Sequence, residues 1–332
     1  PGYEMRDGLM PFGVVDGVRL TNSAPNPILV RQVIENGGVL FYAHPEEPRD
    51  WDLQGLTGME IYNLHADFKD ERRGFLGLLP DILLNFDQYP HLVYRMIFDK
   101  PIDNLAKWDQ LNRTRHVTGV GGNDCHQNTG YRVICTATNS IRCENAIGKT
   151  LWECTLNPVS RFIASIVLGP LEAGRSLFEI QLDPYDLMSM HVTTHVFARS
   201  LTEHDILESL KTGRAFVGFD LLADSTGFLW YATNRTTLVL PGESMPFSDE
   251  VFLCAVAPCR CRLTILRNGH PVQQTEGTSL RCRPAEPGVY RAEAELKIRG
   301  KWTPWVYTNP IWLVVDKTAV PGVVPDRASG QH

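Results

Sequence analysis

The stretch Gly38-Val-Leu-Phe-Tyr-Ala43 carries the strongest fold signal in the chain. It follows a segment of helical periodicity, Ile28 to Asn36, which ends at the stop signal Asn36-Gly37-Gly38. A continuous apolar run of this length is typical of a strand buried on both faces, as in a parallel sheet. Gly58-Met-Glu-Ile-Tyr-Asn63 and Val117-Thr-Gly-Val-Gly-Gly122 are predicted as the next two strands. Strand, helix and strand in this order predict an α/β fold, either a barrel or an open parallel sheet.

The length of the chain predicts two domains, because 332 residues exceed what one hydrophobic core usually supports. A block of leucine, aspartate, arginine and aromatic residues between the second and third strands is predicted to be a helical insertion near the site. Beyond Asp220 the sequence alternates in Thr, Val and Cys, with Pro-Gly and Asn-Gly turns, which indicates a β-sandwich. The predicted divisions are 1–224 for the α/β domain, 66–117 for its insertion, 225–316 for an immunoglobulin-like sandwich and 317–332 for a flexible tail.

Composition excludes several classes of protein. Hydrophobic residues make up 43% and charged residues 21% of the chain, which is ordinary globular usage. A net charge of -6 provides no basic field for nucleic acid, and no apolar stretch reaches the length of a membrane helix. We therefore expect a soluble protein with a small-molecule substrate, and neither nucleic acid nor a membrane as partner.

The chain opens with Pro1-Gly-Tyr-Glu4, without Met or the apolar core of a secretion signal, which predicts a cut into a longer chain. The compartment stays open, cytoplasmic or exported if a signal precedes residue 1, and so does the oligomeric state. The eight cysteines include no CxxC pair, so structural zinc is not expected. Either one disulfide or buried free thiols fit the four cysteines of the C-terminal part, Cys254, Cys259, Cys261 and Cys282.

Residues that commonly bind metals follow two of the predicted strands. His44 comes directly after Ala43, and Asp124 and His126 follow the turn Gly121-Gly122-Asn123. Side chains at the carboxyl ends of parallel strands converge on one crevice. Imidazole and carboxylate groups beside small glycines suit a divalent cation. A single histidine after a strand is more often a packed or solvent-facing residue, but the combination predicts a metal site.

These residues resemble a known family. Tyr42-Ala-His-Pro45, Gly58 to Asn63 and Gly121-Gly-Asn-Asp-Cys-His126 look like the later motifs of the PHP (polymerase and histidinol phosphatase) superfamily, in its carbamate-hydrolase-like branch. The resemblance extends over nearly the whole chain, to about Val315. It implies a distorted (β/α)7 barrel, here without its first strands, followed by an all-β sandwich. The C-terminal segments that share it are Thr194-His195, Leu210 to Arg214, Pro287 to Arg291 and Pro304 to Ile311.

The resemblance also implies roles for single residues. It makes Glu4, His44, Asp124 and His126 the ligands of two or three divalent ions, with Glu4 bridging, and manganese, iron and zinc all occur in the superfamily. His65, beside Asp67, is the candidate proton donor, with an ordinary loop histidine as the alternative. Glu60 and Asn63 are the predicted supporting residues, which would orient ligands. His195 and Arg214 are predicted to face the substrate. The alternatives are a core histidine for His195 and a helix cap for Arg214.

One departure from the family pattern is the absence of any H-x-H pair, which in the superfamily supplies early ligands. Either the chain lacks roughly its first sixty residues, or it is a degenerate member that binds metal poorly. A barrel without its first strands would leave sheet edges unpaired, so the structure should show how the gap is filled.

The predicted function is that of a metal-dependent hydrolase, which uses a metal-bridging water to cleave a phosphoester or a related ester or carbamate. That activity would be lost if the truncation removes essential ligands. The alternative is a non-catalytic or degenerate PHP-like binding protein whose β-sandwich binds a ligand or partner. Metal content separates the two hypotheses.

Overall fold

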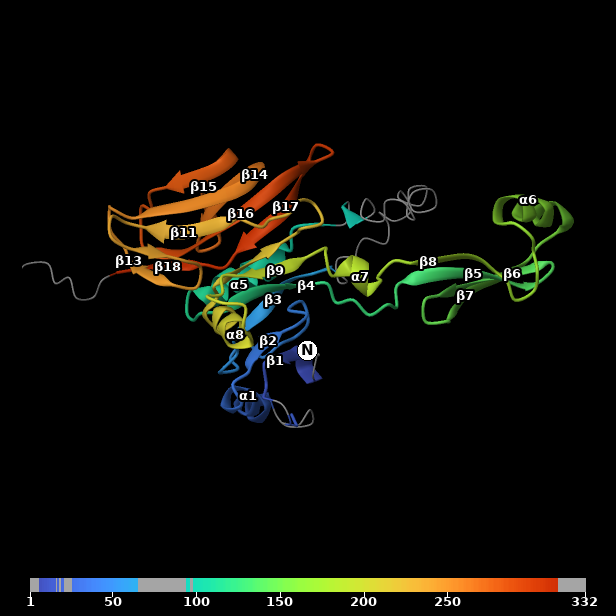
Figure 1. Cartoon of the computed structure of the whole chain (residues 1–332), viewed down its shortest axis with the longest axis horizontal. Coiled ribbons are helices and arrows are strands. Elements are labelled where there is room, and N and C mark those ends of the chain that lie inside the picture. The colour runs from blue at the N-terminus through green and yellow to red at the C-terminus, as the bar shows by residue number, and fades with distance from the viewer. Residues whose placement is uncertain are drawn as a thin grey trace, which may run out of the picture.

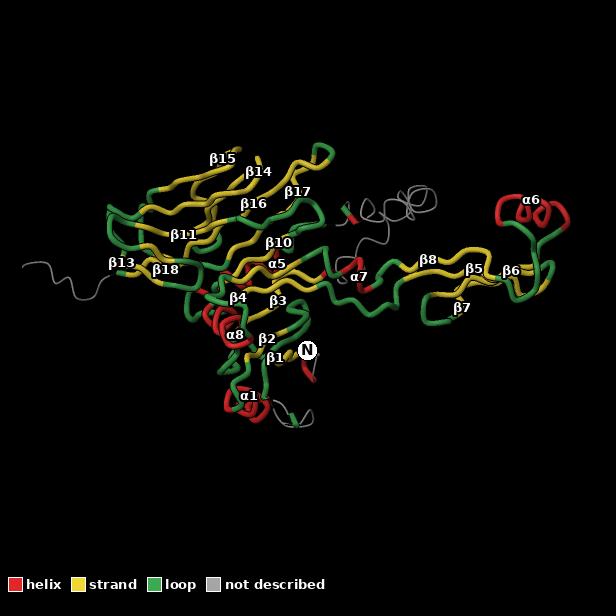
Figure 2. Tube along the Cα trace, viewed as in Figure 1, coloured by secondary structure: helices red, strands yellow, loops and turns green. Residues whose placement is uncertain are grey.

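The computed structural model describes residues 6–15, 17, 19–20, 26–64, 94–95 and 98–315. Within these ranges the chain forms eighteen strands in three sheets and five α-helices. Figures 1 and 2 show a small sheet near the N-terminus, a large sheet built mainly from the C-terminal part, and an arm that extends away from both. No helix in the described ranges is both long and apolar enough to cross a membrane.

The first sheet contains the three parallel strands that the sequence predicted. Its order is β1-β2-β3-β4, with β2, β3 and β4 parallel and β1 antiparallel to β2. Every residue of β2 and β3 is buried, as expected for strands covered on both faces. The elements of this part are a short 3-10 turn at Arg6–Gly8, β1 (Leu9–Phe12), α1 (Asn26–Glu35), β2 (Val39–Tyr42), β3 (Gly58–Asn63), α5 (Ile102–Asn112) and β4 (Thr118–Gly122).

The predicted (β/α)7 barrel is wrong. In the first sheet only β2, β3 and β4 run parallel, and the described residues 43–57 between β2 and β3 contain no helix. After β4 the chain enters an antiparallel hairpin instead of a covering helix. A barrel closes only when each strand is followed by a crossover to a parallel neighbour. The described part of the chain is therefore mostly β, with large antiparallel sheets. Within the predicted insertion at 66–117, α5 is helical and residues 65–93 lie outside the described residues, as does the predicted tail 317–332.

The arm was not predicted from the sequence. It is a four-stranded antiparallel sheet in the spatial order β7-β6-β5-β8, and one helix lies between β7 and β8 in the chain. Within the described residues, none of its buried side chains joins the main hydrophobic cluster. Its elements are β5 (Gly130–Ala137), β6 (Ser140–Asn145), β7 (Thr150–Thr155), α6 (Pro158–Leu168) and β8 (Ser176–Gln181).

The large sheet crosses the predicted domain boundary at residue 224. β10 pairs with β17, nearly a hundred residues later, and with β9, so two strands of the predicted α/β domain belong to the C-terminal sheet. Helix α8 is capped by the Thr202 side chain and ended by Gly213 in the left-handed conformation. The elements are α7 (Tyr185–Met188), β9 (Thr193–Val196), α8 (Glu203–Thr212), β10 (Ala215–Gly218), β11 (Leu229–Thr233), β12 (Leu238–Val239), β13 (Ser244–Pro246), β14 (Phe252–Arg267), β15 (His270–Cys282), β16 (Gly288–Ile298), β17 (Lys301–Thr308) and β18 (Ile311–Val314).

Both edges of the parallel sheet are covered in the described residues. On one side β1 pairs with β2. On the other, side chains replace a strand: the buried Asn309 accepts from the backbone N–H of Gly119 (2.7 Å) and donates to the carbonyls of Gly119 and Ala215 (3.0 Å each). These bonds satisfy backbone groups that a free edge would leave unpaired.

A buried ion network fixes α5 against the large sheet. The Arg291 guanidinium donates two parallel hydrogen bonds to the Asp109 carboxylate (2.6 and 2.7 Å) and a third to Glu293 (2.7 Å). Burial lowers the pKa of Arg291, but the two carboxylates outweigh it and keep the side chain charged. Lys100 pairs with Glu293 and balances the second carboxylate.

All eight cysteines are free thiols, including the four for which a disulfide was an open possibility. Burial raises the pKa of Cys261 to about 12, so this thiol stays protonated at neutral pH. The interpretation as buried free thiols is confirmed for Cys254, Cys261 and Cys282, whereas Cys259 is a free thiol that is only partly buried.

The Arg291 network gives a stability prediction. Asp109→Ala leaves a buried guanidinium without its bidentate partner and should lower the free energy of unfolding by about 3 kcal/mol or more. The matched control is Glu250→Ala, because Glu250 pairs with Arg235 at the exposed surface, and it should cost less than about 1 kcal/mol. Urea unfolding of both variants measures the difference, and equal effects would contradict a structural role for the network.

Candidate active site

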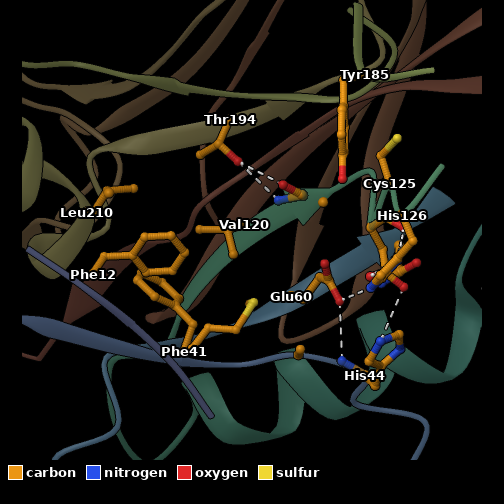
Figure 3. Close-up of a pocket in the computed structure, with 16 residues that line it drawn as sticks. Phe12, Phe41, His44, Glu60, Val120, Cys125, His126, Tyr185, Thr194 and Leu210 are labelled. Carbon is orange, nitrogen blue, oxygen red and sulfur yellow. Dashed lines mark hydrogen bonds and ion pairs between the residues drawn. The ribbon is translucent and has the colours of Figure 1, made fainter. Parts of the chain in front are cut away.

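A cavity of about 700 Å³ lies over the carboxyl ends of the parallel strands (Figure 3). Strand ends β2, β3 and β4 supply its polar side, and β1 and α8 supply apolar groups. Its lining residues are Met10, Phe12, Phe41, Ala43, His44, Glu60, Asn63, Val120, Gly121, Gly122, Asp124, Cys125, His126, Tyr185, Thr194 and Leu210.

His44 and Asp124, which the sequence predicted as ligands, meet in this cavity. His44 Nε2 lies 3.3 Å from Asp124 Oδ2, although 80 residues separate them in the chain. Both residues adopt the left-handed backbone conformation, with φ of 48° and 49°. Residues other than glycine rarely adopt this conformation, and such strain clusters at functional sites. The fold therefore holds both side chains toward one point at a conformational cost.

The buried Glu60 carboxylate lies behind this pair and organises it. Glu60 Oε2 accepts hydrogen bonds from the His44 backbone N–H (3.2 Å) and from Asn63 Nδ2 (3.0 Å). Burial raises the pKa of Glu60 to about 7, although both hydrogen bonds act against the increase. A side chain at Gly122 would place its Cβ 2.0 Å from Glu60 Oε1, so only glycine fits beside this carboxyl.

Charged neighbours hold a proton on His44. Hydrogen bonds from the imidazole to Asp124 and Glu46, the latter at 2.9 Å from Nδ1, raise the pKa of His44 to about 10 despite partial burial. A metal ligand must be a neutral imidazole, so a cation that binds here has to displace this proton. Binding should consequently strengthen as pH rises.

His126 is the third predicted ligand in the cavity. Its Nδ1 lies 2.8 Å from the backbone carbonyl oxygen of Asp124. A carbonyl can only accept, so Nδ1 carries the proton and the neutral ring has its lone pair on Nε2. The ring is half exposed on the cavity side shown in Figure 3. This tautomer is the one that metal-binding histidines adopt when a carbonyl orients them.

Asp183 holds the loop that carries Asp124 and His126. Its buried carboxylate accepts from the backbone N–H groups of Asn128 (3.0 Å) and Thr129 (2.9 Å). The Cys125 thiol donates to the Asp183 carbonyl (2.8 Å). The two ends of the arm are therefore tied together directly beside the cavity.

Sequence reasoning missed several lining residues. Phe12 and Phe41 pack edge to face, with ring centroids 5.9 Å apart, and with Leu210 they form an apolar wall opposite His44 and His126 (Figure 3). Tyr185 enters from α7, which follows the unpredicted arm, so no motif marked it. Cys125 stood inside the quoted GGNDCH segment, and its position between two predicted ligands was the available signal.

His195 belongs to a separate cluster and does not line the cavity. Its Nε2 contacts Asp220 Oδ2 (2.8 Å), Ser225 Oγ (3.0 Å) and Thr193 Oγ1 (3.0 Å), while the ring stacks on Phe216. A Ser-His-Asp triad needs the two ring nitrogens to serve the acid and the nucleophile separately. Because one nitrogen makes all three contacts, this cluster is no such triad.

The remaining predicted residues lie elsewhere. Arg214 pairs with Glu243, with Nε 3.5 Å from Oε1, and is not among the cavity-lining residues, while Gly213 forms the helix cap that the sequence offered as the alternative. Glu4, His65 and Asp67 lie outside the described residues.

Among the residues that the structure describes, no three His, Cys, Asp or Glu side chains are already arranged to hold a metal ion. His44 and Asp124 supply two converging donors of the types that zinc, iron and manganese accept, so the donor chemistry fits a divalent cation. No protein-family model, curated protein or solved structure matches this chain.

The contact between Gly122 and Glu60 gives the next prediction. Gly122→Ala forces the new methyl group into the buried carboxyl and should destabilise the protein by about 1–3 kcal/mol. Gly277→Ala is the matched control, because the nearest atoms to its Cβ are 3.9 Å away. Thermal and urea unfolding measure both, and an unchanged stability of Gly122→Ala would refute the predicted steric constraint.

The His195 cluster predicts a pH dependence of stability. Burial raises the pKa of Asp220, but hydrogen bonds from His195, Ser225 and Thr193 outweigh it and hold the pKa well below its usual range. Below a pH of about 3.9 the unfolded carboxyl takes up a proton while the folded one stays ionised, so acid favours unfolding. The stability advantage of the wild type over Asp220→Asn should be full at pH 7 and shrink below pH 4.

Urea unfolding between pH 3 and pH 7 tests this. Asp249→Asn, at an exposed position, should follow the wild type at every pH. A constant gap between the wild type and Asp220→Asn across that range would show that the cluster does not stabilise the ionised carboxyl.

Proposed function

We propose that this protein is a metal-dependent hydrolase whose active site is the cavity around His44 and Asp124. The observation that carries the proposal is the convergence of these two side chains, each on a strained left-handed residue two positions beyond the end of a parallel strand. The resemblance of the motifs that contain these residues to those of PHP-type hydrolases also supports it.

Each residue of the polar side has a defined part in this proposal. Asp124 would supply a carboxylate ligand, and His44 and His126 would supply imidazole ligands, to one divalent cation. Glu60 and Asn63 fix the strand ends that carry His44, through the Glu60 contacts to the His44 backbone and the Asn63 amide. When bound, such a cation supplies a Lewis acid that polarises the scissile group and promotes the ionisation of water.

The size and lining of the cavity support a small substrate. A volume of about 700 Å³ lies within the usual range for small-molecule pockets. The His44 side can take the polar group that is cleaved, and the opposite wall of Phe12, Phe41 and Leu210 can exclude water from it. Phosphoesters and related esters or carbamates are the proposed substrate class.

The test measures metal content and hydrolysis together. The purified protein, loaded with manganese or zinc and desalted, should retain at least one equivalent by elemental analysis. It should hydrolyse a phosphomonoester, a phosphodiester or an aryl carbamate. His44→Ala and Asp124→Asn each remove a donor and should reduce both affinity and rate by about 100-fold or more.

His270→Ala is the matched control, because His270 is exposed on β15 in the large sheet. It should leave metal content and rate unchanged. A wild-type protein that retains no metal, or a His44→Ala variant that hydrolyses at the wild-type rate, would reject the proposal and favour a binding protein.

A further inference from the structure

Helix α6 at the tip of the arm presents its apolar face to solvent. Val159, Phe162, Ile163 and Ile166 are spaced as i, i+3, i+4 and i+7, which places them on one stripe. They are 70%, 66%, 55% and 68% exposed. This is the spacing by which a helix normally packs against a core.

The opposite face of α6 is the one that packs against the arm. Ser160, Ala164, Ser165 and Leu168 are the partly covered residues, and they lie on the other side of the helix. No residue of α6 whose burial is described is fully buried. The helix therefore turns mainly small or polar residues inward and its largest apolar residues outward, the reverse of a helix in a finished domain.

The arm sheet has a half-covered apolar face as well. The strand registers put Trp152 beside Cys143, Cys143 beside Val133, and Tyr131 beside Ile180. Because Tyr131 and Val133 are two residues apart on β5, Trp152, Cys143, Tyr131 and Ile180 share one face. Cys143 and Ile180 are buried, whereas Trp152 and Tyr131 are each 47% exposed. Every residue of the edge strand β7 is exposed. An uncovered edge beside uncovered apolar residues is a pairing surface.

We propose that the arm is a dimerisation element, in which the outward stripe of α6 and the exposed part of the sheet pack against the same surface of a second copy of this chain. Such a contact is isologous, so the surface must complement itself. The α6 stripe does so, because two identical helices can pack their stripes together across a two-fold axis. Figure 1 shows the arm clear of the two main sheets, where a second arm can reach it.

Charge and area favour a second copy over other occupants. Residues 130–181 contain five basic and four acidic side chains, so two arms carry almost no net repulsion, and the arm lacks the basic excess that draws a helix to anionic lipids. The exposed apolar residues of the α6 stripe and of the sheet face that contains Trp152 are Tyr131, Trp152, Val159, Phe162, Ile163 and Ile166. At about 100 Å² each they offer on the order of 600 Å², which reaches the lower end of what each partner buries in a specific interface.

Light scattering coupled to size-exclusion chromatography of the full chain tests the proposal. The wild type should have twice the mass of one chain at micromolar concentration, and Phe162→Glu/Ile166→Glu should have the mass of one chain, with dimer affinity reduced at least about 30-fold. Because both positions are exposed in the single chain, far-ultraviolet circular dichroism and the melting temperature should be unchanged. The matched control, Leu201→Glu, changes an apolar residue that is 95% exposed outside the arm, and it should remain dimeric.

Disulfide trapping locates the interface. In a Cys154→Ser background, Ile163→Cys should form an intermolecular disulfide under mild oxidation, because residue 163 lies near the middle of the stripe. Ser160→Cys, on the inward face, should not. A monomeric wild type, a double variant that stays dimeric, or a wild type that is monomeric in solution but bound to phospholipid vesicles through Phe162 and Ile166 would each overturn the proposal.

Discussion

The hydrogen bonding of the free edge of β4 constrains both the fold and the site. β4 pairs with β3 on one side, and on the other its backbone is satisfied by side chains: Asn309 at Gly119 and Thr194 at Gly121. Strands β9 and β10 can lie close to β4 because β4 has a glycine, Gly121, at the point where the Val217 and Val192 side chains approach it. Since Asp124 follows directly, this junction also fixes the direction in which the strand delivers its carboxylate. The joined sheets and the site thus depend on the same few glycines and on the Asn309 and Thr194 side chains.

Local patterns in the sequence predicted the parallel strands and the meeting of His44 with Asp124, because both follow from rules that act within short segments. Apolar runs identify buried strands, and the carboxyl ends of neighbouring parallel strands must lie together. The barrel prediction failed because it extended three strands to seven by resemblance. The pairing of Phe216 with Thr308 joins segments that no local pattern connects. The arm was not predicted because the apolar stripe of α6 faces outward. In the sequence, such a stripe does not show which segment the helix packs against.

The candidate site also contains some residues that the sequence could predict and others that it could not. Ligand-type residues were visible in the sequence because they follow strands, whereas the apolar wall formed by Phe12 and Leu210 comes from an edge strand and a helix whose placement depends on tertiary packing. His195 shows that a place on a strand near the site does not by itself make a residue part of the site. It lies on a strand next to the site, but its ring stacks on Phe216 and its Nε2 bonds to Asp220, so it serves the packing of the large sheet.

The arm and the cavity share one anchor. The arm begins at Gly130, four residues after His126, and ends at Gln181, four residues before Tyr185, so both of its ends carry residues that line the cavity. Asp183 ties these ends together through the backbone of Asn128 and Thr129. A partner that holds the arm in one orientation would restrict the Asp124 loop through this anchor. The buried Asp183 carboxylate therefore lies between the arm, which carries the proposed dimer surface, and the loop that carries the candidate ligands.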